Sequence, residues 1–183
     1  MNRYCIMGSL LVFLLVVVGS SRARRDAEPV YAGRPVGEWL DCGYEQAAMA
    51  LHETGPSAAP VIFSKLRREH PQYGLRAQYR KLWCKAPRAI RPALPAPKVA
   101  SFDDARACSE LLEIGPLVIP ALAAGLKDVN PGVRLASAWA LGCFRERGSN
   151  ISSATPFLLR AREDPNTAVR QRVAAALGTL GKS

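Results

Sequence analysis

The chain has 183 residues, of which 49% are apolar and 22% are charged, a composition typical of a globular protein that excludes disorder throughout. It has only two histidines, and none of its five cysteines forms a Cys-x-x-Cys pair, which argues against a histidine-built metal site, a zinc ribbon and a thioredoxin-type site. These counts favour a binding or scaffolding protein over an enzyme, and we expect no metal and no cofactor.

The formal net charge of +10 is concentrated in two segments. Residues 1–25 hold four arginines and no acidic residue, and residues 70–102 hold seven basic residues and no acidic one. The rest of the chain is slightly acidic overall. A uniformly basic nucleic-acid-binding protein is therefore not predicted. The two basic segments are instead the places where we expect contact with a membrane.

The N-terminal segment, residues 1–25, has the pattern of a membrane-targeting sequence. Arg3 precedes a largely apolar run over residues 6–18, which small residues follow, as in a secretory signal peptide. Residues 4–20 also reach the lower length limit of a spanning helix, and the arginines behind them oppose translocation and cleavage. We expect a single membrane anchor or a signal for export to the periplasm or extracellular space. The remaining alternative is a buried core helix.

The rest of the chain contains internal repeats. One match has an offset of sixty positions and a second has an offset of thirty-six. The first takes Gly55, Pro56 and Pro60 to Gly115, Pro116 and Pro120; the second takes Asp128, Val133 and Arg134 to Asp164, Val169 and Arg170. Repeats with such periods are typical of stacked structural units.

Each repeat has the features of a helical hairpin. Ala107, Leu111 and Ile114 recur every three or four positions, which indicates a helix packed on one face. Gly115 suits the position just past a helix end, where a positive φ is often required. The prolines that follow it suit the first turn of a second helix, whose amides have no intrahelical partners. Because one hairpin cannot bury its apolar face alone, neighbouring hairpins must stack.

The combined pattern resembles the HEAT repeat: I-G-P-x-x-x-P-x-L-x-x-x-L-x-D in residues 114–128, then P-x-V-R and A-L-G in residues 131–142. This resemblance implies an all-α fold, a short right-handed α-solenoid of about three hairpins over residues 44–183, behind an N-terminal hydrophobic helix. It also implies that the arginine of each V-R pair makes a structural contact with the aspartate that ends the preceding helix. Here the arginines are Arg134 and Arg170, and the aspartates are Asp128 and Asp164.

Residues 26–43 are expected to form a tether and a leading block. Within them, the segment from Tyr31 to Leu40 resembles one found before the repeats in bacterial HEAT-repeat proteins with a hydrophobic N-terminus.

A basic, proline-rich insert at residues 72–101 separates the first two hairpins. We expect an amphipathic helix over residues 74–86 and then a semi-rigid connector. Three interpretations of residues 74–98 remain open: a packed helix with a solvated charged face, contact with anionic lipid headgroups, or contact with nucleic acid through aromatic stacking. The stacking candidates are Tyr79 and Trp83. The candidate residues for contact with an anionic surface are Arg76, Arg80, Lys81 and Lys85.

The sequence contains no motif of a nucleophile elbow, a phosphate-binding loop, a dinucleotide fold or a zinc protease. We interpret His52 and His70 as surface residues, and Asp103-Asp104 as a helix start favoured by the helix dipole. The tryptophans Trp39, Trp83 and Trp139 are predicted to fill the core. Cys108 is predicted to be a buried thiol. After export, a disulfide could form among Cys42, Cys84, Cys108 and Cys143.

We therefore expect a non-catalytic protein-interaction scaffold with an unidentified protein partner. One alternative is a module that binds anionic lipid or, as the less favoured ligand, nucleic acid through its insert. Another is an enzyme of the HEAT-like class, such as a glycosylase or a bilin lyase. An enzyme would need residues such as Trp139, Asp103 or Glu110 together in an open pocket. The sequence sets no oligomeric state.

Overall fold

The computed structural model describes residues 28–87, 91–98 and 102–178, so the predicted signal or anchor at residues 1–25 lies outside the described residues. The regular structure is almost entirely helical, which confirms the all-α prediction. In chain order the elements are β1 (Val30–Tyr31), β2 (Arg34–Pro35), α2 (Val36–Cys42), α3 (Tyr44–Thr54), the 3₁₀ turn η1 (Gly55–Ala58), α4 (Ala59–Glu69), α5 (Leu75–Lys85), η2 (Arg91–Ala93), α6 (Asp104–Ile114), η3 (Pro116–Val118), α7 (Ile119–Gly125), α8 (Pro131–Glu146), α9 (Thr155–Ala161) and α10 (Thr167–Leu177).

The leading block folds into a small β-hairpin followed by α2. Ala32 and Gly33 connect β1 to β2 with φ values of +47° and +76°, because a two-residue hairpin loop favours positive φ at both positions. Trp39 on α2 donates its indole N–H to the Tyr31 carbonyl at 3.0 Å. This contact ties α2 to the hairpin at one end of the helical stack.

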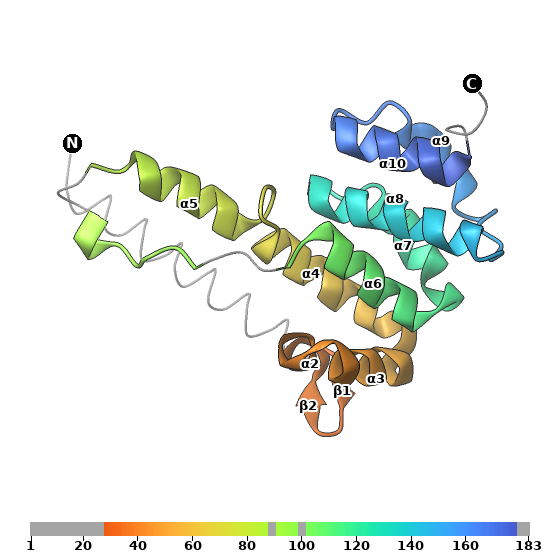
Figure 1. The fold of residues 1–183 in the computed structure, drawn as a ribbon, viewed down its shortest axis with the longest axis horizontal. Helices are drawn as coiled ribbons and strands as arrows, with labels where there is room; N and C mark the ends of the chain where they lie inside the picture. The colour runs from red at the N-terminus through yellow and green to blue at the C-terminus, as the bar shows by residue number, and fades with distance from the viewer. Residues whose placement is uncertain (1–27, 88–90, 99–101, 179–183) are drawn as a thin grey trace.

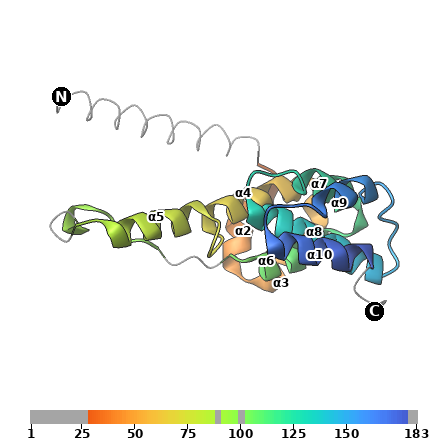
Figure 2. The same ribbon diagram turned by 90° about the horizontal axis from the view of Figure 1, so that it is seen from above.

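Apart from α5, the remaining helices pair into three hairpins, α3–α4, α6–α7 and α8–α9, and α10 follows as a further first helix. The hairpins stack one on another between α3 at one end and α10 at the other (Figure 1). Viewed from above, the second helices α4, α7 and α9 lie on one side, and α3, α6 and α10 lie on the other (Figure 2). The first helices make the more extensive contacts with one another, since α8 packs along both α6 and α10.

Small residues explain the close packing of α8. Ala136, Ala138 and Ala140 are fully buried. An added Cβ at Gly142 would lie 3.5 Å from the Ala176 Cα of α10, an ordinary contact distance. The alanine-rich segment of the sequence therefore lets the helix backbones approach closely, and leucines on either side fill the core.

The junctions within the first two hairpins share one geometry. Gly55 has φ +60° and Gly115 has φ +85°, values that favour glycine. Pro56 and Pro116 lie in the 3₁₀ turns that follow. Pro60 and Pro120 lie in the first turn of α4 and α7, where a missing N–H costs no intrahelical hydrogen bond. The proline and glycine positions of the sequence thus set the reversal of direction.

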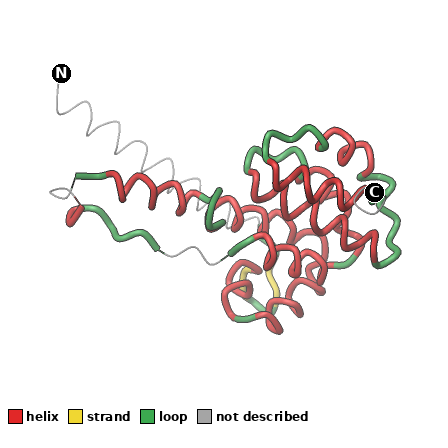
Figure 3. The backbone as a smooth tube through the Cα atoms, turned by 45° about the horizontal axis from the view of Figure 1, so that its top comes forward, coloured by secondary structure: helices red, strands yellow, loops and turns green. Residues whose placement is uncertain are grey.

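The insert forms an arm that leaves the stack. Helix α5 continues beyond α4 and points away from the body, and the extended segment returns beside it (Figures 1 and 3). Tyr79 donates its hydroxyl to the Pro95 carbonyl at 2.7 Å, which holds the returning segment against α5. Leu75 is 63% exposed and Leu82 is 68% exposed, so the interpretation of a helix packed through its apolar side is wrong.

Among the described residues, no single helix has the length and hydropathy needed to cross a membrane. The segments Asp104–Ile114 and Pro116–Gly125 satisfy those two criteria only when taken together, as a pair bent by 111°.

Candidate interaction surfaces

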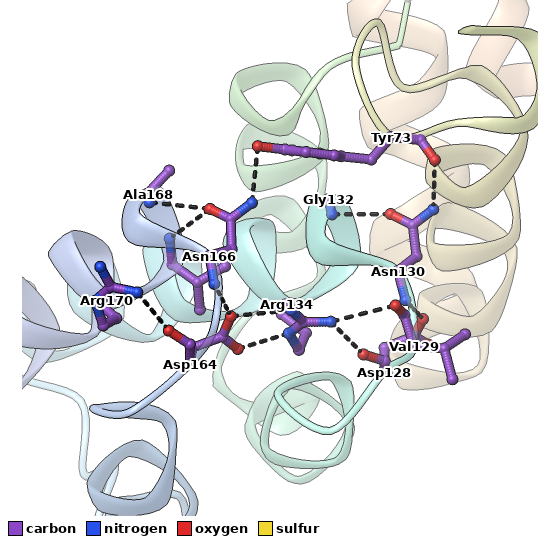
Figure 4. A network of polar contacts seen from close by, with 11 residues as sticks. Tyr73, Asp128, Val129, Asn130, Gly132, Arg134, Asp164, Asn166, Ala168 and Arg170 are labelled. Carbon is purple, nitrogen blue, oxygen red and sulfur yellow. Dashed lines mark hydrogen bonds and ion pairs between the residues drawn. The ribbon is translucent and has the colours of Figure 1, made fainter. Parts of the chain in front are cut away.

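A ladder of arginine–aspartate pairs joins successive hairpins at the loops that precede α8 and α10 (Figure 4). Arg134 on α8 binds the Asp164 carboxylate through two hydrogen bonds of 2.7 and 2.9 Å. Its third nitrogen donates to the Asp128 carbonyl at 2.9 Å. The Asp128 carboxylate accepts hydrogen bonds from Arg67 on α4 instead. Arg67 of the first hairpin therefore reaches the carboxylate at the end of the second, and Arg134 reaches the carboxylate at the end of its own hairpin, α8–α9.

The contact that the resemblance implies is present, and it runs through the backbone of each aspartate. The side chain of Arg134 meets only the backbone carbonyl of Asp128, and Arg170 likewise meets the Asp164 carbonyl, at 2.6 Å. The carboxylate of Asp128 pairs with Arg67 instead, and that of Asp164 pairs with Arg134. Because the repeats place one aspartate before Arg134 and another after it, the sequence spacing alone could not tell which of the two carboxylates Arg134 binds.

The ladder shifts the acid–base equilibrium of its carboxylates. Burial alone would raise the pKa of Asp164, but the hydrogen bonds and charge of Arg134 and the Asn166 amide outweigh it, so the pKa is lowered. Burial alone would also raise the pKa of Asp128. The hydrogen bonds from Arg67 and the Asn130 amide outweigh this effect, so the pKa of Asp128 is lowered. Both carboxylates therefore remain charged through neutral and mildly acidic pH, and the ladder weakens only at pH values below their ordinary range.

Tyr73, in the loop after α4, links the first hairpin to the starts of α8 and α10. Its carbonyl accepts a hydrogen bond from the Asn130 side-chain amide at 3.0 Å, and its hydroxyl accepts one from the Asn166 amide at 2.9 Å (Figure 4). Asn130 and Asn166 are also the N-caps of α8 and α10. One tyrosine therefore positions the start of two stacked helices.

His70 supports this tyrosine. It is 3% exposed, so the interpretation of His70 as a surface residue is wrong, whereas His52 is exposed. The His70 Nδ1 accepts hydrogen bonds from the amides of Gln72 and Tyr73, at 3.1 and 3.2 Å, and the two rings stack at 4.8 Å. Because Nδ1 is an acceptor, the neutral ring carries its proton on Nε2, which lies 3.5 Å from Asp104 Oδ1.

The substitution Tyr73→Phe should lower the free energy of unfolding by about 1 kcal/mol, because the Asn166 amide loses its acceptor in a half-buried site. The loss should be localised: amide hydrogens in α10 should exchange faster, while those in α3 keep their protection. Urea unfolding and hydrogen exchange followed by mass spectrometry measure the two effects.

Tyr79→Phe is the matched control, because its hydroxyl bonds within the arm and not within the stack. It should leave α10 unchanged. Equal exchange in α10 for both variants would show that Tyr73 does not link the repeats.

A groove separates the second helices α7 and α9. Two adjoining depressions, with volumes of about 260 and 390 Å³, share Lys127 and Phe157 in their walls. The Lys127 ammonium lies over the Phe157 ring, 4.4 Å from its centroid. Most of the lining surface of the groove is apolar, and it includes Pro120, Ala123, Ala124, Leu126 and Ala161. The charged residues Arg160, Glu163 and Asp164 line one of the two depressions, and Lys127 lines both. The groove is an open surface that suits a bound segment of chain.

The four basic residues predicted to contact an anionic surface all lie on α5. Arg76 approaches Glu69 at 3.3 Å, and Arg80 donates to the Pro71 carbonyl at 3.4 Å, so both are directed back to the base of the arm. Lys81 and Lys85 are exposed and make no ion pair or hydrogen bond within the described ranges. The arm thus presents two cations to solvent and keeps two near the stack.

Comparison with protein families decides the assignment. Residues 119–183, from α7 to the end of the chain, match the family model of HEAT repeats. The chain contains HEAT repeats. The matched part includes the HEAT segments that carry Arg134, Asp164 and Arg170. No curated protein and no solved structure matches the chain.

The HEAT stack does not bring the residues named for a HEAT-like enzyme into one pocket. Asp103 is exposed and caps α6 by accepting the Arg106 amide at 2.9 Å. Glu110 is 1% exposed, and Arg172 covers the Trp139 ring at 3.7 Å. None of the three lines the groove between α7 and α9. Within the described residues, no group of three His, Cys, Asp or Glu side chains could hold a metal ion.

The tryptophans differ from the core positions predicted for them. Each is only half-buried and carries an arginine on its face, at 4.7 Å for Trp39, 5.3 Å for Trp83 and 3.7 Å for Trp139. Only Trp139 packs against the main core. The guanidinium groups shield aromatic faces that the short helices leave open.

The described cysteines are free thiols. Cys108 is 3% exposed, as predicted, and burial raises the pKa of its thiol to about 12. Cys143 is its neighbour, and Cys42 and Cys84 lie at the surface.

Proposed function

We propose that this protein is a non-catalytic, short right-handed α-solenoid that acts as a protein-interaction scaffold, and that residues 1–25 attach it to a membrane or direct its export. The HEAT repeats at residues 119–183 support the scaffold role, since repeats of this kind mediate protein interactions. The groove between α7 and α9 is the single observation that carries the proposal, because it is an open apolar surface on the repeats themselves.

The ladder gives this groove a fixed width. Arg134 bonds both the loop after α7, through the Asp128 carbonyl, and the loop after α9, through the Asp164 carboxylate. The two walls of the groove are therefore connected at one end through a single side chain. A preformed site of this kind binds a partner without first ordering itself, which favours affinity.

The groove chemistry favours one kind of partner segment. Ala124 and Phe157 offer apolar contact, and Lys127 places a positive charge beside the ring. A segment with an apolar side chain next to a carboxylate would satisfy both features, because the carboxylate could pair with the ammonium at the rim.

Site-specific photocrosslinking in the native membrane fraction tests the proposal. A photoreactive amino acid in place of Ala124, exposed in the groove, should capture a discrete partner. The same amino acid in place of Ser109, exposed on α6 in the other layer, should not. Adding Lys127→Glu to the Ala124 crosslinker should reduce the yield severalfold, through repulsion of the expected carboxylate.

Capture of the same proteins from residues 124 and 109, or a yield that Lys127→Glu leaves unchanged, would contradict a specific role for the groove. Circular dichroism of each variant would confirm that its helices are retained.

A further inference from the structure

One face of α5 combines exposed leucines with exposed cations. Leu75, Gln78, Leu82 and Lys85 follow one another at intervals of three or four residues, and Lys81 lies beside them. All five are exposed, and the two leucines are 63% and 68% exposed. No acidic residue occurs anywhere in residues 70–102 to oppose the lysines. Exposed leucines next to lysines, with no acidic residue nearby, are typical of a helix that lies in a membrane interface.

The adjoining side of α5 is already occupied. The Arg91 guanidinium lies 5.3 Å from the centre of the Trp83 ring and bonds the Ala86 carbonyl at 2.9 Å, while Pro95 receives the Tyr79 hydroxyl. The returning segment therefore covers the aromatic side and leaves the leucine–lysine face exposed. The arm points away from the stack, so no described helix covers that face (Figure 3).

The same contacts argue against nucleic acid as the ligand. Binding of single strands relies on aromatic rings that are open to base stacking. The Trp83 ring carries an arginine on its face, and the Tyr79 hydroxyl holds that ring beside the returning segment. Exposed leucines have no role in contact with phosphates, whereas they gain by entering lipid.

From this arrangement we infer that the leucine–lysine face of α5 binds the surface of an anionic phospholipid bilayer. Leu75 and Leu82 enter the boundary between headgroups and acyl chains, and the long stems of Lys81 and Lys85 carry their ammonium groups up to the phosphates. The contact is small, because α5 has only eleven residues. It rests on the proposed membrane attachment of residues 1–25, which would hold the arm near the bilayer at high effective concentration.

The test uses the full chain with an environment-sensitive fluorescent amino acid in place of Leu82, reconstituted in vesicles. Neutral phosphatidylcholine vesicles are compared with vesicles that contain phosphatidylserine, and brominated lipid serves as quencher. With anionic vesicles the emission should shift to the blue and be quenched. The same probe in place of Leu117, which is 75% exposed on η3, should respond to neither vesicle.

Two variants with equal net charge locate the contact. Lys81→Gln with Lys85→Gln should lower the partition of the probe into anionic vesicles roughly thirtyfold, from the loss of two headgroup contacts. Arg76→Gln with Arg80→Gln removes the same charge, but those side chains point to Glu69 and Pro71, so a much smaller loss is expected.

A probe that stays in water with anionic vesicles would overturn the inference, as would equal quenching in neutral vesicles or equal losses in the two charge variants. A larger response to a single-stranded oligonucleotide than to vesicles would overturn it in favour of nucleic acid. Flotation of the vesicles measures attachment of the whole chain independently of the probe. A chain that does not float shows that residues 1–25 do not anchor it, whereas a chain that floats with its probe in water shows that α5 does not bind the bilayer.

Discussion

The substitution Arg134→Leu should lower the free energy of unfolding by about 3 kcal/mol, measured by urea denaturation at pH 7. The reason is the burial of the pair: the Arg134 side chain is 11% exposed and that of Asp164 is 6% exposed. Without its partner, the Asp164 carboxylate remains charged in a site that water hardly reaches. The Asp128 carbonyl loses a donor as well. Removing one member of a buried pair is costly for this reason, even where the intact pair adds little to stability.

Two comparisons separate this effect from ordinary surface electrostatics. Glu38→Gln breaks the pair of Arg34 and Glu38, whose side chains are 47% and 57% exposed, and should cost less than about 1 kcal/mol. Arg134→Lys keeps the charge but loses the forked geometry, so its cost should lie between the other two. Similar losses for Arg134→Leu and Glu38→Gln would show that the ladder does not hold the repeats together.

A double-mutant cycle assigns the energy to the pair itself. Asp164→Asn keeps the acceptor for the Asn166 amide but removes the charge. Combined with Arg134→Leu, it should cost at least about 1 kcal/mol less than the sum of the single variants, because no unpaired carboxylate remains. If the stability losses of the two single variants simply add in the double variant, the effect of Arg134 comes from its contacts with backbone carbonyls and not from its pair with Asp164.

The ladder also marks the limit of what the repeat pattern could predict. Hairpin helices, glycine junctions and proline starts are local features, and each is encoded within a few neighbouring residues such as Gly115 and Pro116. The partner of Asp128 is Arg67, which lies sixty-one positions earlier and beyond the insert. No periodicity specifies that contact, because it depends on how α4 packs beside the next hairpin.

The interpretations of His70 as a surface residue and of α5 as a packed helix are wrong for related reasons. A histidine at a helix end ordinarily faces solvent, but the tight turn at Gly74 folds the chain over it. A Cβ at Gly74 would lie 2.5 Å from the His70 backbone nitrogen. The spacing of Leu75, Tyr79 and Leu82 correctly indicated a helix, yet it could not show that the apolar side would lack a partner. A periodic apolar pattern shows that residues share one face of a helix, but it does not show which element packs against that face.

A second large effect is expected from Glu110, a carboxyl group buried on α6. Its side chain is 1% exposed, and its Oε1 accepts a hydrogen bond from Arg106 at 3.1 Å, while Oε2 has no partner among the described residues. Burial raises the pKa of Glu110 from 4.5 to about 7, against the opposing effect of Arg106 and Lys65. The folded protein therefore binds a proton at this group at pH values where the unfolded chain has released it.

The sign of the pH dependence follows from that difference. A carboxyl with a raised pKa in the folded state contributes its full stability below the unfolded value, and the contribution is lost as the pH rises through about 7. A shift of this size corresponds to about 3 kcal/mol. Between pH 5 and pH 8 the wild-type chain should thus lose stability from this one group.

Glu110→Gln should remove most of that loss, since glutamine keeps an acceptor for Arg106 and cannot ionise. Relative to wild type, the variant should become progressively more stable from pH 5 to pH 8, by up to about 3 kcal/mol, in urea unfolding measured at each pH. Glu113→Gln provides the control on the same helix, because its carboxylate pairs with the Tyr44 hydroxyl at the surface. It should leave the wild-type pH dependence in place.

A constant difference in stability between Glu110→Gln and wild type across this pH range would contradict the assignment, whatever its size, because only titration of the group makes the difference grow with pH.

Titration of the ladder carboxylates Asp128 and Asp164 does not interfere with this measurement. The pKa values of Asp128 and Asp164 are lowered, so their contribution is lost at pH values below 4, as the pH falls and not as it rises. The two kinds of buried carboxyl thus act in separate pH windows and in opposite directions: at neutral pH the charge of Asp164 is compensated by Arg134, whereas ionisation of Glu110 leaves one oxygen without a partner.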